Sequence, residues 1–349
     1  MTDLISLQSE IARDVSNKLK TKLSGADEQK LAKNYTANAE AYQHYLRGRF
    51  FWNKRTPNDF KKAIEYFQQA IALDTDYALA YVGLADAYLL LPNYGGASTR
   101  EVMPKAQAAA LKALSLDDQL AEAHATLGAI LGQYNYDYTA EELEYKRAIE
   151  LNPNYPTAHQ WYGELFDRLG RHEEAVVEFR RALEIDPFSL IINRSYGESL
   201  LYDRKFDEAI AQLKKTVELD ATFAGAHSSL AVVYQVKGSH AESVEEVTKF
   251  LELVGSAETA ALMRESYARG GRHGFLRAMT GKHRPADVPP FIAATFHAEL
   301  GEKDEAIAEL NNAYENREIF LPLKVDPRLD PLRDDPRFTD LLRRVGLEK

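Results

Sequence analysis

Residues 156–189 read PTAHQWYGELFDRLGRHEEAVVEFRRALEIDPFS, and this stretch decides the fold. Apolar and aromatic residues recur at steps of three and four on both sides of Gly170, which is the pattern of one buried helical face. Gly163 in the first half and Ala175 in the second half are small residues at which a helix can meet a neighbouring backbone closely. Gly170 fits a left-handed helix stop. The stretch therefore predicts two antiparallel helices joined by a tight turn.

The same unit recurs along the chain. Equivalent positions in the second helices stand 34 residues apart at Ala148, Ala182, Thr216 and Phe250. The pattern Tyr162-Gly163-x2-Phe166, followed by Ala175-x3-Phe179 and then Pro187, resembles the tetratricopeptide repeat. The resemblance implies an all-α fold, a right-handed superhelical solenoid of antiparallel helix pairs.

The predicted organisation is one repeat array with modified ends, because a solenoid needs caps on its terminal repeats. Residues 1–38 are expected to form an amphipathic helix and linker, as a cap or as the end of a TolB-like domain. Repeat units 1–6 fill residues 39–255, a degenerate unit fills 256–283, a further unit fills 284–316, and residues 317–349 form a C-terminal cap. Two irregularities stand out: nine extra residues around Pro92–Ser98, and Glu141 at a place where a small residue is expected.

Three segments extend the resemblance beyond the repeats. The strings Leu7–Val15 and Tyr45–Thr56, and the two Asp-Pro-Arg sequences at Asp326 and Asp335, look similar to TolB-like multidomain proteins of bacteria. In that group the repeats follow a winged-helix DNA-binding, protein-kinase or nucleotide-cyclase output domain. The resemblance therefore implies a bacterial signalling or regulatory role, although none of those output domains is found in this sequence.

Composition excludes several classes of function. The chain has 349 residues, 43 basic and 53 acidic side chains, a net charge of −10 and no cysteine. An acidic chain repels a phosphate backbone, so no nucleic-acid partner is expected. The absence of cysteine excludes disulfides, thiolate nucleophiles and zinc-thiolate sites. No apolar run reaches the ~18 residues that a membrane helix needs. The chain is expected to be cytoplasmic as it stands and without direct membrane contact; the alternative is an extracytoplasmic sensor part of a larger membrane-anchored protein.

The sequence predicts no catalytic residue, cofactor site or metal site. His124, His159 and His227 share one repeat position, and equivalent places in stacked units lie about 10 Å apart, too far to share an ion with ~2 Å bonds. Glu164 and Asp167 lie three residues apart on one helix face. A glycosidase needs its carboxylates on opposite sides of a cleft, so a solvated helix face is favoured.

The resemblance implies instead a recognition surface. In this family the second, fifth, ninth and twelfth places of each unit line a concave groove. Read in that register, the groove carries five acidic side chains and one basic side chain. We expect it to bind a basic or amphipathic peptide or protein segment; the alternative is that the acids only keep the groove soluble. The candidate groove residues are Asp86, Glu122, Gln160, Glu164, Asp167, Arg194, Glu198 and Gln235.

The sequence therefore favours a non-catalytic interaction scaffold or sensor region. A small-molecule receptor is the second hypothesis, with the groove or the Pro92–Met103 turn as the binding site. A helical-repeat hydrolase comes third. The oligomeric state is not predicted.

Overall fold

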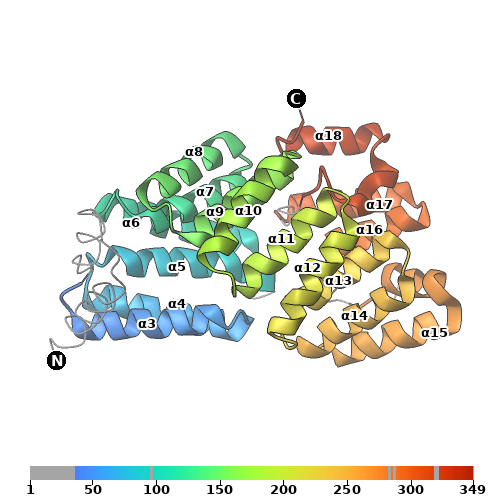
Figure 1. Ribbon diagram of the computed structural model, residues 1–349, viewed down its shortest axis with the longest axis horizontal. Helices are drawn as coiled ribbons and strands as arrows, with labels where there is room; N and C mark the ends of the chain where they lie inside the picture. The colour runs from blue at the N-terminus through green and yellow to red at the C-terminus, as the bar shows by residue number, and fades with distance from the viewer. Residues whose placement is uncertain (1–35, 95–96, 282–283, 286–287, 318–321, 349) are drawn as a thin grey trace. The chain divides into compact units, whose positions relative to one another are not determined.

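The computed structural model describes residues 36–94, 97–281, 284–285, 288–317 and 322–348. In these residues every regular element is a helix, which confirms the all-α prediction (Figure 1). The predicted helix at residues 3–23 lies outside the described residues. Among the described helices none is long and apolar enough to cross a bilayer.

Consecutive helices alternate in direction and pack as pairs. The elements are α3 (Ala39–Asn53), α4 (Pro57–Leu73), α5 (Ala78–Leu90), η1 (Leu91–Tyr94), α6 (Thr99–Leu116), α7 (Ala121–Asn135), α8 (Tyr138–Leu151), α9 (Pro156–Leu169), α10 (His172–Ile185), α11 (Leu190–Tyr202), α12 (Phe206–Leu219), α13 (Ala224–Lys237), α14 (His240–Leu253), α15 (Ala257–Thr280), α16 (Pro290–Leu300), α17 (Lys303–Glu315), η2 (Pro327–Leu332) and α18 (Pro336–Arg344).

The chain divides into two compact units within α7. Unit 1 ends at Ile130 and unit 2 begins at Leu131. In unit 1 the largest fully buried side chains include Phe60, Phe67 and Tyr77.

Left-handed residues end many of the first helices of a pair, as the sequence predicts. Gly170 and Gly238 have φ values of 79° and 81°, and Gly301 has 77°. Gly271, with a φ of 57°, lies inside α15 and breaks the helical dihedrals there. Three equivalent turns place larger residues in the same conformation, which is strained for a side chain with a Cβ. They are Arg55 (φ 57°) in unit 1, and Tyr136 (φ 59°) and Arg204 (φ 62°) in unit 2.

Small residues in the first helices do allow close approach, but the neighbour is a side chain and not the backbone. A Cβ on Gly163 would lie 2.9 Å from the Phe179 ring, and a Cβ on Gly197 would lie 2.6 Å from Leu213. Each glycine therefore makes room for a large residue of its partner helix. This contact sets the distance between the two helices of the pair.

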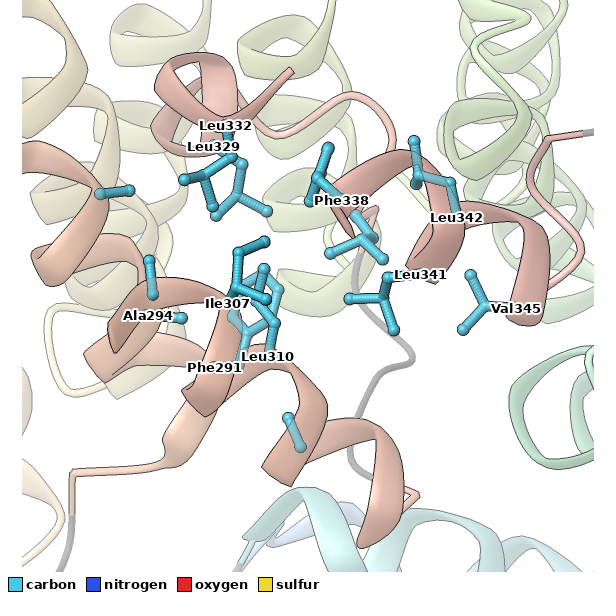
Figure 2. Packing of buried hydrophobic residues seen from close by; sticks show 14 of the residues in the cluster. Phe291, Ala294, Ile307, Leu310, Leu329, Leu332, Phe338, Leu341, Leu342 and Val345 are labelled. Carbon is cyan, nitrogen blue, oxygen red and sulfur yellow. The ribbon is translucent and has the colours of Figure 1, made fainter. Parts of the chain in front are cut away.

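In unit 2, residues 322–347 pack against the last helix pair. Figure 2 shows Leu329 and Leu332 of η2 and Phe338 of α18 gathered against Phe291 of α16 and Leu310 of α17. All five are at most 2% exposed. This apolar burial holds the end of the chain in place.

The same C-terminal part of unit 2 also reaches the turns with left-handed residues. The Tyr136 ring stacks on Tyr314 at 6.1 Å between centroids, and Arg204 forms an ion pair with Asp330 at 2.9 Å. In unit 2, the side chains of these two turn residues thus contact α17 and η2.

Candidate functional site

In unit 1, Asp86 is buried inside the fold and is not a free groove charge. Thr126 Oγ1 donates a hydrogen bond to Asp86 at 2.6 Å, and Arg49 Nη1 lies 3.3 Å from the other carboxylate oxygen. Burial raises the pKa of Asp86, and Arg49 and Thr126 act in the opposite direction. Glu122 on α7 is part-exposed, so it alone of the two predicted residues in unit 1 offers a carboxylate to a ligand.

In unit 2, Glu164 on α9 joins two neighbouring repeats. It accepts a hydrogen bond from Gln160 Nε2 at 2.9 Å on its own helix and from Ser195 Oγ at 2.8 Å on α11. The Glu164 side chain is part-exposed, and Gln160 is buried. Burial raises the pKa of Glu164, while the two hydrogen bonds lower it.

Glu198 repeats this arrangement one unit later. It accepts hydrogen bonds from Arg194 Nη2 at 2.7 Å and from Ser229 Oγ at 2.6 Å on α13. Arg194 Nε also donates to Ser229 at 3.1 Å. The structure therefore brings Arg194 and Glu198 together as an ion pair, so the predicted negative charge of this part of the groove is largely balanced.

These contacts form a polar ladder, which we define as the hydrogen bonds from a hydroxyl of one repeat to the ninth-place acid of the repeat before it. The donor and acceptor are 31 residues apart for both Ser195–Glu164 and Ser229–Glu198. The Thr126–Asp86 pair is 40 residues apart because the long turn adds nine residues. The ninth-place acids thus link the stacked helices, and Glu164 and Glu198 are in addition part-exposed.

Sequence reasoning missed the hydroxyls of the ladder, although a signal was present. Thr126, Ser195 and Ser229 all stand at the sixth place of their units, each one unit after a ninth-place acid. Where the ninth place is Ala129, the following sixth place is Trp161. In these units a ninth-place acid is therefore followed, one unit later, by a sixth-place hydroxyl.

Two further candidates lie apart from the ladder. Asp167 is 3% exposed, accepts from Ser199 Oγ at 3.1 Å and bonds with His172 Nδ1 at 2.9 Å. Burial raises its pKa to about 6, against the lowering effect of His172 and Ser199. Gln235 on α13 donates to Glu299 at 2.8 Å and contacts none of the other predicted residues.

The repeat-position histidines serve as links between helices and turns. Nδ1 of His159 lies 2.6 Å from Glu178, and Nδ1 of His227 lies 2.5 Å from Glu246. The Nε2 atom of each ring lies 3.1 Å from a backbone carbonyl of the preceding turn. Within the described ranges no group of His, Asp and Glu has the arrangement of a metal site.

Glu141 shows how an acid fits where a small residue was expected. It is fully buried on α8, pairs with Arg168 of α9 and accepts from Tyr145 Oη at 2.9 Å. Gly132 provides the space, because a Cβ there would overlap the carboxylate. Burial raises the pKa of Glu141 to about 7 although Arg168 favours the charged form.

A hollow of about 530 Å³ lies at the end of unit 2. It is lined by Lys324, Arg333, Phe338, Thr339, Leu342, Gly346, Leu347 and Glu348. None of the predicted groove residues and no residue of the Pro92–Met103 turn is among these lining residues.

Two family models, both described as tetratricopeptide repeat, match residues 55–98 and 144–177. The segment 144–177 contains the turn at Gly170 between α9 and α10. The chain contains tetratricopeptide repeats. Repeats of this type support a role as a protein–protein interaction scaffold, and the fold is typically non-catalytic.

Proteins similar to this tetratricopeptide-repeat protein include regulators and other repeat proteins. The transcriptional regulator HilA of Salmonella typhimurium and that of Salmonella typhi are both 29% identical over 132 residues. The match covers 38% of this chain and 24% of HilA, so the chain spans about a quarter of the length of these relatives.

Solved structures of tetratricopeptide-repeat proteins are also similar. YrrB, described as having an unusual peptide-binding site, is 22% identical, with 57% of this chain and 97% of YrrB covered and a TM-score of 0.36. A thermophilic repeat protein of Thermus thermophilus, TTC0263, is 16% identical, with 56% of this chain and 99% of TTC0263 covered and a TM-score of 0.48.

Proposed function

We propose that this tetratricopeptide-repeat protein is a non-catalytic scaffold that binds a peptide or protein segment along α9, α11 and α13 of unit 2. The observation that carries the proposal is the polar ladder between these helices. It fixes the spacing of successive helices before any ligand arrives, and a pre-organised surface loses less entropy on binding. The part-exposed residues of this face are Glu164, Arg194, Glu198, Ser228, Val232 and Gln235.

The chemistry of the partner follows from which charges remain available. Arg194 balances Glu198, so this pair suits a polar segment of either sign. The basic character proposed for the partner rests on Glu164, whose hydrogen bonds come from neutral groups, and in unit 1 on Glu122. We also propose that this binding serves a bacterial regulatory role in the cytoplasm. It is supported by the similarity of part of the chain to a transcriptional regulator.

Selection of peptides from a random library against the full chain tests the proposal. Ser228 is part-exposed on α13 and engages in none of the ladder bonds described above, so Ser228→Arg blocks the face without breaking the ladder. Val177, 64% exposed on α10, provides the matched control Val177→Arg.

We expect selected peptides to bind the wild type and Val177→Arg equally in calorimetric titrations. Ser228→Arg should weaken their binding by about tenfold or more, because a fully desolvated contact at the centre of an interface contributes at least ~1.4 kcal/mol. Peptides that bind Ser228→Arg as well as the wild type would place the binding surface elsewhere.

A further inference from the structure

The outward side of α3 and α4 in unit 1 exposes apolar side chains. Phe50 is 58% exposed, and Leu46, one helical turn earlier on the same face, is 38% exposed. Residues four apart on a helix are neighbours, so the two form one patch.

Aromatic rings that pack on one another adjoin this patch. The Phe51 and Tyr66 rings stack at 5.4 Å between centroids with planes 5° apart. Phe50 meets Phe51 edge to face at 5.3 Å. The rings come from both helices of the pair, so the patch is held by the packing of α3 on α4.

Three cations lie over these rings. Lys54 Nζ is 4.6 Å from the centre of Phe50 and 5.2 Å from that of Phe51. Lys62 Nζ is 5.2 Å from Phe51, and the Arg47 guanidinium is 5.9 Å from Tyr66. We call these cations and rings the cation–aromatic face: Arg47, Phe50, Phe51, Lys54, Lys62 and Tyr66.

The charge of this face is not neutralised by the described part of the chain. All three cations are exposed, and no ion pair joins any of them to a carboxylate of a described residue. Arg49, also on α3, lies within ion-pair distance of Asp86. An aromatic ring orients a cation but leaves its net charge in place. A chain of net charge −10 therefore presents here a local positive and apolar surface.

We propose that the cation–aromatic face docks an acidic amphipathic segment of a partner protein. Its apolar side chains would contact Leu46 and Phe50, and its carboxylates would lie beside Lys54, Lys62 and Arg47. Charge complementarity argues for this occupant. The surface lies in unit 1 and is separate from the α9–α11–α13 face, so the inference stands independently of the proposed function.

The chain's own residues 1–35 complement this surface poorly. Their acidic and basic side chains nearly balance: Asp3, Glu10, Asp14, Asp27 and Glu28 against Arg13, Lys18, Lys20, Lys22, Lys30 and Lys33. Nucleic acid is disfavoured because few phosphates could be neutralised by so small a set of cations on an acidic chain.

Fluorescence anisotropy with the full chain tests the inference. The probe is a fluorescein-labelled helical peptide of Glu and Leu residues, with a Lys and Leu peptide of the same length as the charge control. Lys54→Glu/Lys62→Glu reverses the charge of the face, and Phe50→Ser removes its apolar centre. Lys112→Glu, at an exposed lysine on α6, is the matched control. All substituted side chains are exposed, and circular dichroism confirms that each variant is folded.

The acidic peptide should bind the wild type and Lys112→Glu alike, and added salt should weaken it. Lys54→Glu/Lys62→Glu should lose about tenfold or more in affinity, and Phe50→Ser should also weaken binding. Equal binding to the charge-reversed variant, or preference for the basic peptide, would overturn the inference. The inference would also be overturned if this face bound only phosphatidylserine vesicles in a flotation assay, or only a second copy of the chain in sedimentation.

Discussion

At the scale of single residues, the pairs of facing positions within each repeat vary together in size. Gly197 faces Leu213, and Gly163 faces Phe179. At the equivalent places of the next unit the sequence has Ala231 and Val247, a larger residue in the first helix and a smaller one in the second. From the Gly197 unit to the next, the larger side chain in the first helix is thus offset by a smaller one in the second helix.

Replacing Gly197 by Ala should destabilise the protein by about 1–3 kcal/mol, because the new methyl group would overlap Leu213. The higher helix propensity of Ala offsets this by roughly 1 kcal/mol. The double variant Gly197→Ala/Leu213→Val, which copies the next unit, should recover most of the loss. Urea unfolding measures both. A double variant less stable than Gly197→Ala would contradict this recovery.

Asp167 should make stability depend on pH. Burial raises its folded pKa to about 6, so the folded chain holds the proton more tightly than the unfolded chain does. The stabilisation that follows is fully present below about pH 4 and is lost as pH rises through about 6. Between pH 4 and 7, the free energy of unfolding of Asp167→Asn relative to that of the wild type should therefore rise by on the order of 2–3 kcal/mol.

The measurement is the urea midpoint of both proteins at several pH values. His172 faces Asp167, so the same series with His172→Gln separates its contribution. A difference between wild type and Asp167→Asn that stays constant from pH 4 to 7 would contradict the assignment.

At the scale of elements, α8 and α9 are joined by a buried ion pair. Arg168→Met would leave the Glu141 carboxylate buried without its cation, which costs about 3–5 kcal/mol when one partner of a buried pair is removed. Glu141→Gln/Arg168→Met removes the charge and should recover much of that loss. Thermal unfolding of the two variants compares them directly, and equal melting temperatures would argue against a charged Glu141 in the folded chain.

The helices could be predicted from sequence because their signals are local. Apolar spacing and the stop at Gly170 act within one unit. The polar ladder joins different units, so it depends on how one helix stacks on the next. Glu141 could be recognised from the sequence only as a departure from the repeat pattern, because its partner Arg168 lies on another helix. Reading each acid together with the sixth place of the next unit would have found Ser195 and Ser229.

At the scale of the whole molecule, the chain is a repeat array in two compact units that meet within one helix, α7. The predicted groove residues therefore fall into two sets: Asp86 and Glu122 belong to unit 1, and the other six belong to unit 2. Of the set in unit 2, the part-exposed members lie on α9, α11 and α13. The proposed scaffold role rests on this unit, and the docking proposed for the cation–aromatic face rests on unit 1.

Site-specific photo-crosslinking tests the scaffold role most directly. A benzophenone side chain is placed at residue 228 on the proposed binding face, or at residue 177 on the exposed side of α10, and the full chain is irradiated in cells of the source organism. Mass spectrometry should identify a protein segment attached at residue 228 and none at residue 177. Adducts that form equally at both positions, or none at residue 228, would contradict binding along α9, α11 and α13.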